Sequence, residues 1–171
     1  NKLGGFKIGS VFACGNLLVG NTFDGPGISL FDISNPLEPQ LQSTIKEAFG
    51  YTTLYNGRYV YGIGETPKVW DISNPEKPVL VSKYKGPKMG SKGGYAIFQD
   101  GFLHQGVSST YVKIDVRDPV NPKVVGKQSK AIKKKDWDGA HVVGNLTVIA
   151  CDHGTGSHIV AHQCEIDKKG P

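Results

Sequence analysis

The feature that most constrains the fold is a strand–corner–strand pattern that occurs three times. Its core reads apolar-x-Asp-x-x-x-Pro-x-x-Pro, and successive aspartates lie 39 and 44 residues apart. Proline fixes φ and lacks a backbone donor, so each proline pair stops one strand before the next begins. The aspartate can accept hydrogen bonds from backbone N–H groups just after it and so stabilise a turn. We therefore interpret nine residues as structural turns: Asp32, Pro36, Pro39, Asp71, Pro75, Pro78, Asp115, Pro119 and Pro122.

A hairpin pattern precedes each corner. Asn56-Gly57 and Asp100-Gly101 are strong hairpin signals, Gly15-Asn16 takes the same place in the first unit, and a fourth unit begins at Ala140. Four short strands per unit make one propeller blade, and a period near 40 residues is typical of propellers. We predict an all-β propeller of four-stranded antiparallel blades. The chain would hold about 3.5–4 blades, at about 8–45, 50–84, 94–128 and, as a partial blade, 140–166.

The fourth unit is incomplete, because it lacks the corner motif and ends in CEIDKKGP. A propeller closes on itself, usually with about four to eight blades. The preferred interpretation is that the chain is part of a larger propeller. The alternatives are that copies associate to complete a ring, or that the chain forms a four-bladed monomer.

The three corners resemble the LVIVD-repeat family of β-propellers. The resemblance covers residues 8–164 and includes the form DISNPxxPxxVSxY, Gly-Tyr or Ala-His at the start of the first strand, and Asn-Gly or Asp-Gly turns. It implies an extracytoplasmic protein (periplasmic, secreted or at the cell surface), often of modular build, and it implies no activity. Selenium-binding-protein-type propellers, which include methanethiol oxidases, carry a similar corner. Their cysteine-rich active segment is not found here, so their activity is not carried over.

The charge pattern argues against several classes of partner. Of the 20 basic residues 18 are lysine, and Arg58 and Arg117 are the two arginines. Readers of specific base sequences rely on arginine forks, so we expect no sequence-specific nucleic-acid binding. No apolar run is long enough for a transmembrane helix. The opening NKLGGFKIGS is strand-like, so no signal peptide is expected. Three cysteines allow at most one disulfide.

Nine lysines fall in the connectors between predicted blades, at 46–50, 85–94 and 127–139. In a propeller these connectors lead to the central channel, and an aromatic or imidazole residue follows each one here. Such a positive rim could bind a carboxylate, a phosphate or a polyanionic glycan. The alternative is ordinary solvated lysines and packing tyrosines. The candidate ligand-binding residues are Tyr51, Tyr95, His141, Lys88, Lys92, Lys133, Lys134 and Lys135.

A cluster of cysteines and histidines in the fourth unit is the second candidate site. Thiolate and imidazole groups suit a transition metal. Cys151 and His153 would share a strand face about 6.6 Å apart, and a hairpin at 154–156 could bring His158 close. His158 and His162 would lie about 13 Å apart on one strand, too far for a shared ion without a bend. The alternative is that these residues are buried thiols and hydrogen-bonded histidines, with no cofactor.

The leading functional hypothesis is a non-catalytic propeller platform for a protein or for an anionic glycan or small anion. No nucleophile elbow, P-loop, paired carboxylates or HExxH motif is present, and no helix is expected after GIGETP at 62–67, so that segment is no dinucleotide loop. The alternative hypothesis is a part of a metal-dependent or redox enzyme with its site at Cys151, His153 and His158. We interpret His104, a lone strand histidine, as structural.

Overall fold

The computed structural model describes residues 8–22, 27–47, 51–63, 68–84, 96–107, 110–129, 139–150 and 158–161. All regular structure in these ranges is β-strand, arranged as four antiparallel sheets. Sheet one contains β1 (Ile8–Cys14), β2 (Leu17–Thr22), β3 (Ile28–Asp32) and β4 (Gln40–Ile45). Sheet two contains β5 (Tyr51–Tyr55), β6 (Tyr59–Ile63), β7 (Lys68–Asp71) and β8 (Val79–Lys83). Sheet three contains β9 (Ala96–Gln99), β10 (Phe102–Val107), β11 (Thr110–Asp115) and β12 (Lys123–Ser129). Sheet four contains β13 (Gly139–Val143), β14 (Leu146–Ala150) and β15 (His158–Ala161).

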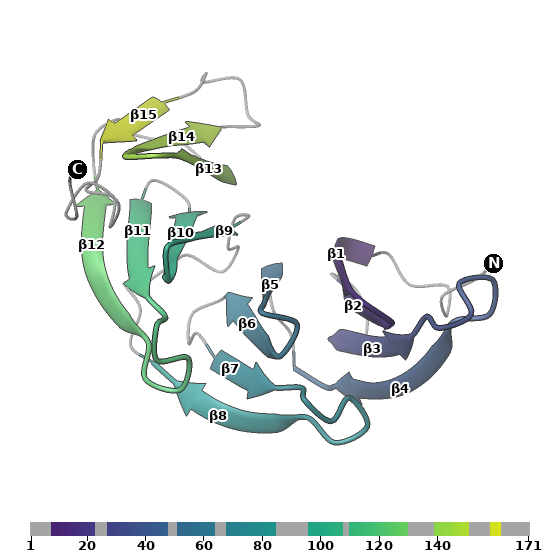
Figure 1. The fold of residues 1–171 in the computed structure, drawn as a ribbon. Coiled ribbons are helices and arrows are strands. Elements are labelled where there is room, and N and C mark those ends of the chain that lie inside the picture. Colours follow the sequence, from purple (N-terminus) through teal and green to yellow (C-terminus); the bar gives the residue numbers. More distant parts are fainter. Residues whose placement is uncertain are drawn as a thin grey trace, which may run out of the picture.

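Each sheet is a meander in which consecutive strands are neighbours, and the four sheets follow one another in an arc (Figure 1). The first strands, β1, β5, β9 and β13, lie on the inner side of the arc, and each contacts the next one. The outer strands β4, β8 and β12 lie on the convex side. The arc is open between sheet one and sheet four, so the described part of the chain forms propeller-like sheets without closing a ring.

Tight turns join the first two strands of each sheet. Asn56 and Asp100 have φ of 51°, and the glycines that follow them, Gly57 and Gly101, have φ of 61° and 79°. Two successive positive φ values match the right-handed twist of the flanking strands, and only glycine, asparagine and aspartate adopt them at low cost. The sequence pairs Asn-Gly and Asp-Gly therefore set the register of their hairpins.

The corners between the third and fourth strands are built from side chains that accept backbone hydrogen bonds. The last residue of the third strand is an aspartate, and it accepts a bond from the N–H two residues later. The distances are 2.7, 2.9 and 3.0 Å at Asp32, Asp71 and Asp115. Three residues after each aspartate a second side chain repeats this bond, at 3.2, 3.1 and 3.2 Å for Asn35, Asn74 and Asp118. The fourth strand then begins directly after the second proline.

Each corner is also tied to the first hairpin of its own sheet. The backbone N–H of the residue after the aspartate donates to a carbonyl in the turn between the first two strands. The donors are Ile33, Ile72 and Val116, at 2.7, 2.8 and 2.9 Å from the carbonyl oxygens of Asn16, Arg58 and Gly101. One end of every complete sheet is thus held together by side-chain and backbone bonds.

The apolar core lies between sheets. Buried valine, leucine and isoleucine side chains fill the space between sheets one and two: Val19, Ile28, Leu30, Ile45, Val60 and Ile72. A second cluster lies between sheets two and three: Tyr61, Val69, Tyr84, Leu103, Val112, Ile114 and Val116. Burial of this apolar surface is the main force that holds neighbouring sheets together.

Sheets three and four meet at a polar contact. His104 of β10 is 1% exposed, and its Nδ1 lies 2.7 Å from the hydroxyl of Tyr111 on β11. The hydroxyl of Thr147 on β14 donates to the same tyrosine oxygen at 3.4 Å. Burial raises the pKa of Tyr111, while the bond from Thr147 opposes that rise. The interpretation of His104 as a structural residue is confirmed by this buried contact.

Among the described residues there is no helix that is long and apolar enough to cross a membrane.

Candidate functional site

The residues expected at the channel mouth lie on or beside the inner strands. Tyr51 begins β5, and Tyr95 directly precedes β9. His141 lies in β13, opposite Val148, and its side chain is exposed. The hairpins of sheets two and four can be aligned by the last paired residues of their first strands, Tyr55 and Val143. In this alignment His141 corresponds to Thr53, and not to Tyr51, which lies two residues earlier in its strand. The side chains of both tyrosines fall outside the described residues.

The connector lysines of the candidate site also fall outside the described residues: Lys88, Lys92, Lys133, Lys134 and Lys135. The strand order defines where their segments attach. Each connector leads from the outer strand of one sheet to the inner strand of the next. Lys46, which directly follows β4, is exposed.

Two of the three candidate metal ligands, Cys151 and His153, lie outside the described residues. His158 begins β15 and pairs with Ile149 of β14, so the expected hairpin has paired strands on both sides. Nothing is described of the His158 side chain. Among the described residues, no group of three His, Cys, Asp or Glu side chains is placed to hold a metal ion.

Both arginines of the chain bind the corner aspartate of their own sheet. Arg58, in the first hairpin of sheet two, places Nε 3.2 and 3.3 Å from the two carboxylate oxygens of Asp71 and Nη2 2.7 Å from Oδ2. Arg117, within the corner of sheet three, binds Asp115 in the same way, at 3.0 and 3.2 Å through Nε and 2.5 Å through Nη2. Sequence reasoning had missed both pairs.

These ion pairs lower the pKa of both carboxyl groups. The hydrogen bond from Arg58 is the largest cause at Asp71 and lowers its pKa to about 2. The hydrogen bond from Arg117 likewise lowers the pKa of Asp115. Each guanidinium also lies over an aromatic ring at the start of the second strand, with its carbon 5.0 Å from the centroid of Tyr59 or Phe102.

Sheet one has the same corner without an arginine. Asn16 stands at the position of Arg58, Ser34 at that of Arg117, and Leu17 at that of the two aromatic residues. The Asp32 carboxylate accepts the N–H of Ser34. Among the described residues it forms no ion pair, so its charge is left without a partner.

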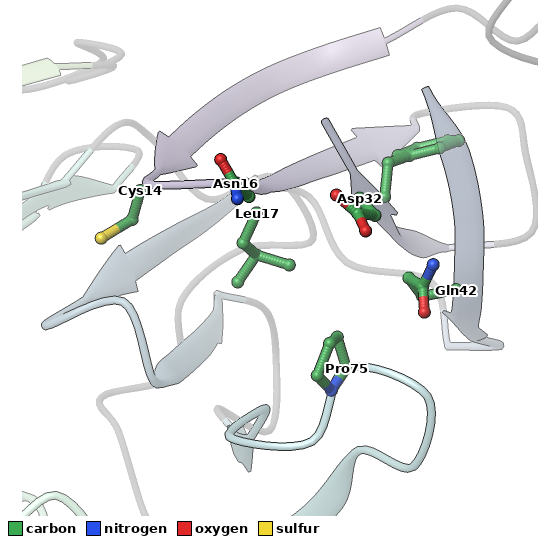
Figure 2. Close-up of a pocket in the computed structure, with 7 residues that line it drawn as sticks. Cys14, Asn16, Leu17, Asp32, Gln42 and Pro75 are labelled. Atoms are coloured by element: carbon green, nitrogen blue, oxygen red, sulfur yellow. The ribbon is translucent and has the colours of Figure 1, made fainter. Parts of the chain in front are cut away.

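A pocket of about 300 Å³ opens at this place, as Figure 2 shows. It lies between the first hairpin of sheet one, its corner, strand β4 and the corner of sheet two. The side chains of Leu17, Asp32, Gln42 and Pro75 surround one common space. The residues that line the pocket are Cys14, Asn16, Leu17, Phe31, Asp32, Gln42 and Pro75.

The corner motif alone carried no signal for this pocket. An alignment of the three units by their corners has an arginine beside the aspartate in the third unit only, at Arg117. The interpretation of the motif as a structural turn rests on backbone hydrogen bonds alone, and it gives the Asp32 carboxylate no further partner.

No protein-family model matches the sequence, and no curated protein is significantly similar to it. Similarity is found among solved structures. The crystal structure of the computationally designed Ika4 protein superposes with a TM-score of 0.67 at 16% identity, over 92% of each chain. A protein from Lactobacillus plantarum gives a TM-score of 0.64 at 11% identity, over 87% of this chain and 54% of its own. KlHsv2, with loop 6CD replaced by a Gly-Ser linker, gives 0.50 at 11% identity, over 87% and 46%.

These similarities define the fold alone. Hsv2 proteins are β-propellers, and the chain shares their arrangement of antiparallel sheets. It spans about half the length of the Lactobacillus plantarum protein and of KlHsv2. The class that the fold supports is therefore a propeller-like all-β protein.

Proposed function

We propose that this chain is part of a non-catalytic propeller platform that binds a protein or an anionic ligand through its lysine-rich connectors. The observation that carries the proposal is how the corners use their charged groups. The corner aspartates bind backbone N–H groups, and both arginines bind two of those aspartates. In sheets two and three the charged groups of the motif are thus occupied with holding the fold. All of the remaining 18 basic residues are lysines, and nine of them belong to the connectors.

A charge-removal experiment tests the connector proposal. We expect the double variant Lys134→Ser/Lys135→Ser to elute from immobilised heparin, a sulfated glycan, at lower salt than the unmodified chain, because fewer cations meet the polyanion. The matched control is Lys77→Ser/Lys123→Ser, which removes two exposed lysines near the corners at the opposite end of the strands. Equal loss of retention in both variants would contradict a connector site and indicate only a dependence on net charge.

The proposed architecture is a closed propeller of which this chain supplies one arc. Sheet four supports it, because one face packs against sheet three and the other is open. Thr147 and Ile149 are fully buried on the first face. The register places Val143, Leu146 and Ile159 on the second, where they are 69%, 41% and 69% exposed. In sheets one and two the corresponding face packs against the next sheet.

We propose that further blades of the same parent protein cover this face, with a second copy of the chain as the alternative. Light scattering of the 171-residue chain tests the architecture. Reversible self-association that increases with concentration is expected, because uncovered apolar sheet faces and strand edges attract other chains. A folded chain that stays monomeric as its concentration is raised would contradict both versions of the proposal.

By resemblance of its corners to LVIVD repeats, the proposed location is extracytoplasmic. Fractionation of cells that express the parent protein tests this, and recovery with cytoplasmic markers would contradict it.

The second candidate function is a metal-dependent or redox enzyme with Cys151, His153 and His158 as ligands. The pairing of Ile149 with His158 supports it, because paired strands flank the segment that carries the other two residues. Elemental analysis of the purified chain and of Cys151→Ser and His153→Ala separates the two functions. A stoichiometric transition metal that both changes remove favours the enzyme, and no metal with unchanged thermal stability favours the platform.

A further inference from the structure

The pocket of sheet one lies where the two neighbouring sheets hold a guanidinium group. In sheets two and three that group donates hydrogen bonds through two of its nitrogens to the corner aspartate. It also lies over the aromatic ring at the start of the second strand. In sheet one the aspartate is present, the arginine is replaced by a shorter side chain, and the ring is replaced by Leu17. The repeat therefore preserves one half of an ion pair and leaves room for the other.

We propose that this pocket binds a guanidinium group supplied from outside the chain, carried by an arginine side chain or by a small guanidinium compound. The chain cannot supply it. Its two arginines are Arg58 and Arg117, and both are engaged in their own sheets. The guanidinium would place two N–H groups on the Asp32 carboxylate, as Arg58 does on Asp71.

The chemistry of the lining favours guanidinium over ammonium. A planar guanidinium matches a carboxylate with two parallel hydrogen bonds, whereas an ammonium is a point charge with a strongly held water shell. Leu17 and Pro75 offer apolar surface to the flat faces and to the alkyl chain (Figure 2). The amide oxygens of Asn16 and Gln42 can accept the N–H groups that Asp32 does not use.

The pocket is independent of the connector lysines. Asp32 lies at the corner end of β3, whereas Ile28 at the other end pairs with Ile45, where the first connector begins. The first connector thus follows the strand end opposite the pocket, and either proposal can fail without the other.

The test uses nuclear magnetic resonance titration of the 171-residue chain with Nα-acetyl-arginine amide. Saturable shifts are expected for the Ser34 amide, which binds Asp32, and for the Leu17 methyl groups, with a dissociation constant that is roughly millimolar for so small a ligand. Nα-acetyl-lysine amide should bind at least about threefold more weakly, because it lacks the fork. No saturable shift, or equal affinity for the two amides, overturns the proposal.

Three variants assign the effect to the pocket. Asp32→Asn retains an acceptor for the turn, as Asn35 does in the same corner at 3.2 Å, but loses the charge, so the arginine amide should bind at least about tenfold more weakly. Asn16→Arg places a guanidinium where Arg58 stands in sheet two and should abolish binding by filling the pocket. Asp115→Asn, the matched change at the corner of sheet three, should leave the affinity unchanged. Unchanged binding to Asp32→Asn, or an equal loss in Asp115→Asn, overturns the assignment.

A second pair of ligands separates the sources of the guanidinium. Tighter binding of acetyl-Gly-Arg-Gly-amide than of propylguanidine supports a peptide as the source, and the reverse order supports a small guanidinium compound. Failure of both to compete with the arginine amide overturns the proposal.

Discussion

Arg58 binds Asp71 through two nitrogens of its guanidinium group and so joins the first hairpin of sheet two to its corner. Arg117 and Asp115 make the same contact from a different place in the repeat. Sheets two and three thus form the same arginine–aspartate ion pair with arginines from different positions of the repeat, whereas sheet one has the aspartate without an arginine. This relationship underlies the pocket and the first two predictions.

The Arg58–Asp71 pair should make stability depend on acid pH. The pKa of Asp71 is about 2 in the folded chain, below its ordinary value of 3.8. A carboxyl group whose pKa falls on folding stabilises the fold above its unfolded pKa, and this stabilisation is lost as the pH falls towards about 2. Arg58→Ala should lower the free energy of unfolding only slightly at neutral pH, because the arginine is exposed, and the difference should shrink below about pH 4. Urea unfolding at a series of pH values measures both. A cost that stays constant down to pH 2 would count against the pair.

Asp32 should tolerate asparagine better than alanine. Asp32→Ala removes the acceptor of the Ser34 N–H and should destabilise the chain by roughly 1 kcal/mol. Asp32→Asn keeps an oxygen at the same place and should cost less than half of that. Thermal unfolding of the two variants side by side is the measurement. Equal losses would mean that charge, rather than the turn bond, is what the corner requires.

Tyr111→Phe should weaken the contact between sheets three and four. The change removes the hydroxyl that lies 2.7 Å from His104 Nδ1 and that accepts from Thr147, at a cost of roughly 1–3 kcal/mol. The tyrosine oxygen accepts from Thr147, and we expect the tyrosine to donate its own proton to Nδ1, which requires the His104 ring proton to be on Nε2. Nitrogen chemical shifts of the His104 ring report the tautomer. A protonated Nδ1, or a variant as stable as the parent, would refute this hydrogen-bond order.

Gln105 should be replaceable with a gain in stability. Its side chain on β10 is fully buried, and within the described ranges neither its amide oxygen nor its amide nitrogen has a hydrogen-bond partner. Gln105→Met has nearly the same shape without the unsatisfied groups, so we expect the free energy of unfolding to rise by about 1–2 kcal/mol. Chemical denaturation measures this change, with the exposed Gln40→Met as the control. A loss of stability would indicate that a bound water or ligand satisfies the amide.

Two glycines with positive φ should differ sharply in their tolerance of alanine. A Cβ at Gly27 would lie 2.2 Å from the carbonyl oxygen of Ile45 and 2.5 Å from that of Glu47, whereas a Cβ at Gly144 would meet no atom of the described part of the chain within 4 Å. Gly27→Ala should therefore cost roughly 3 kcal/mol or more, and Gly144→Ala only about 1 kcal/mol for its backbone conformation. Thermal unfolding of both variants tests the difference, and similar costs would contradict it.

The strands and corners could be predicted from the sequence because their causes are local. Asn56-Gly57 sets a hairpin by backbone conformation alone, and the Asp71 corner is closed by residues within seven positions of it. Hairpins and corners of this kind can be predicted without knowing which sheets pack against each other.

The arginine pairs could not be predicted in this way. Arg58 and Arg117 occupy different positions relative to their aspartates, so an alignment of the corner motif does not bring them together. The pocket in sheet one depends on what is absent beside Asp32, and it becomes visible only when the three sheets are compared in space. The candidate ligands Tyr51, Tyr95, Cys151 and His153 remain predictions, because their side chains lie outside the described residues.

The backbone N–H after each corner aspartate is bonded inside its own sheet, as the bonds of Ile33, Ile72 and Val116 show. One carbonyl of a corner bonds across sheets, because Pro75 accepts from the hydroxyl of Ser43. A sheet of this kind does not need its neighbour to complete its turns, and it meets that neighbour mainly through apolar side chains. Duplication of a segment of about 40 residues could therefore add a blade without altering those already present. Under such growth each copy can gain its own partner for the shared aspartate, as sheets two and three have done. A copy without such a partner, like sheet one, keeps a carboxylate that an external group could bind.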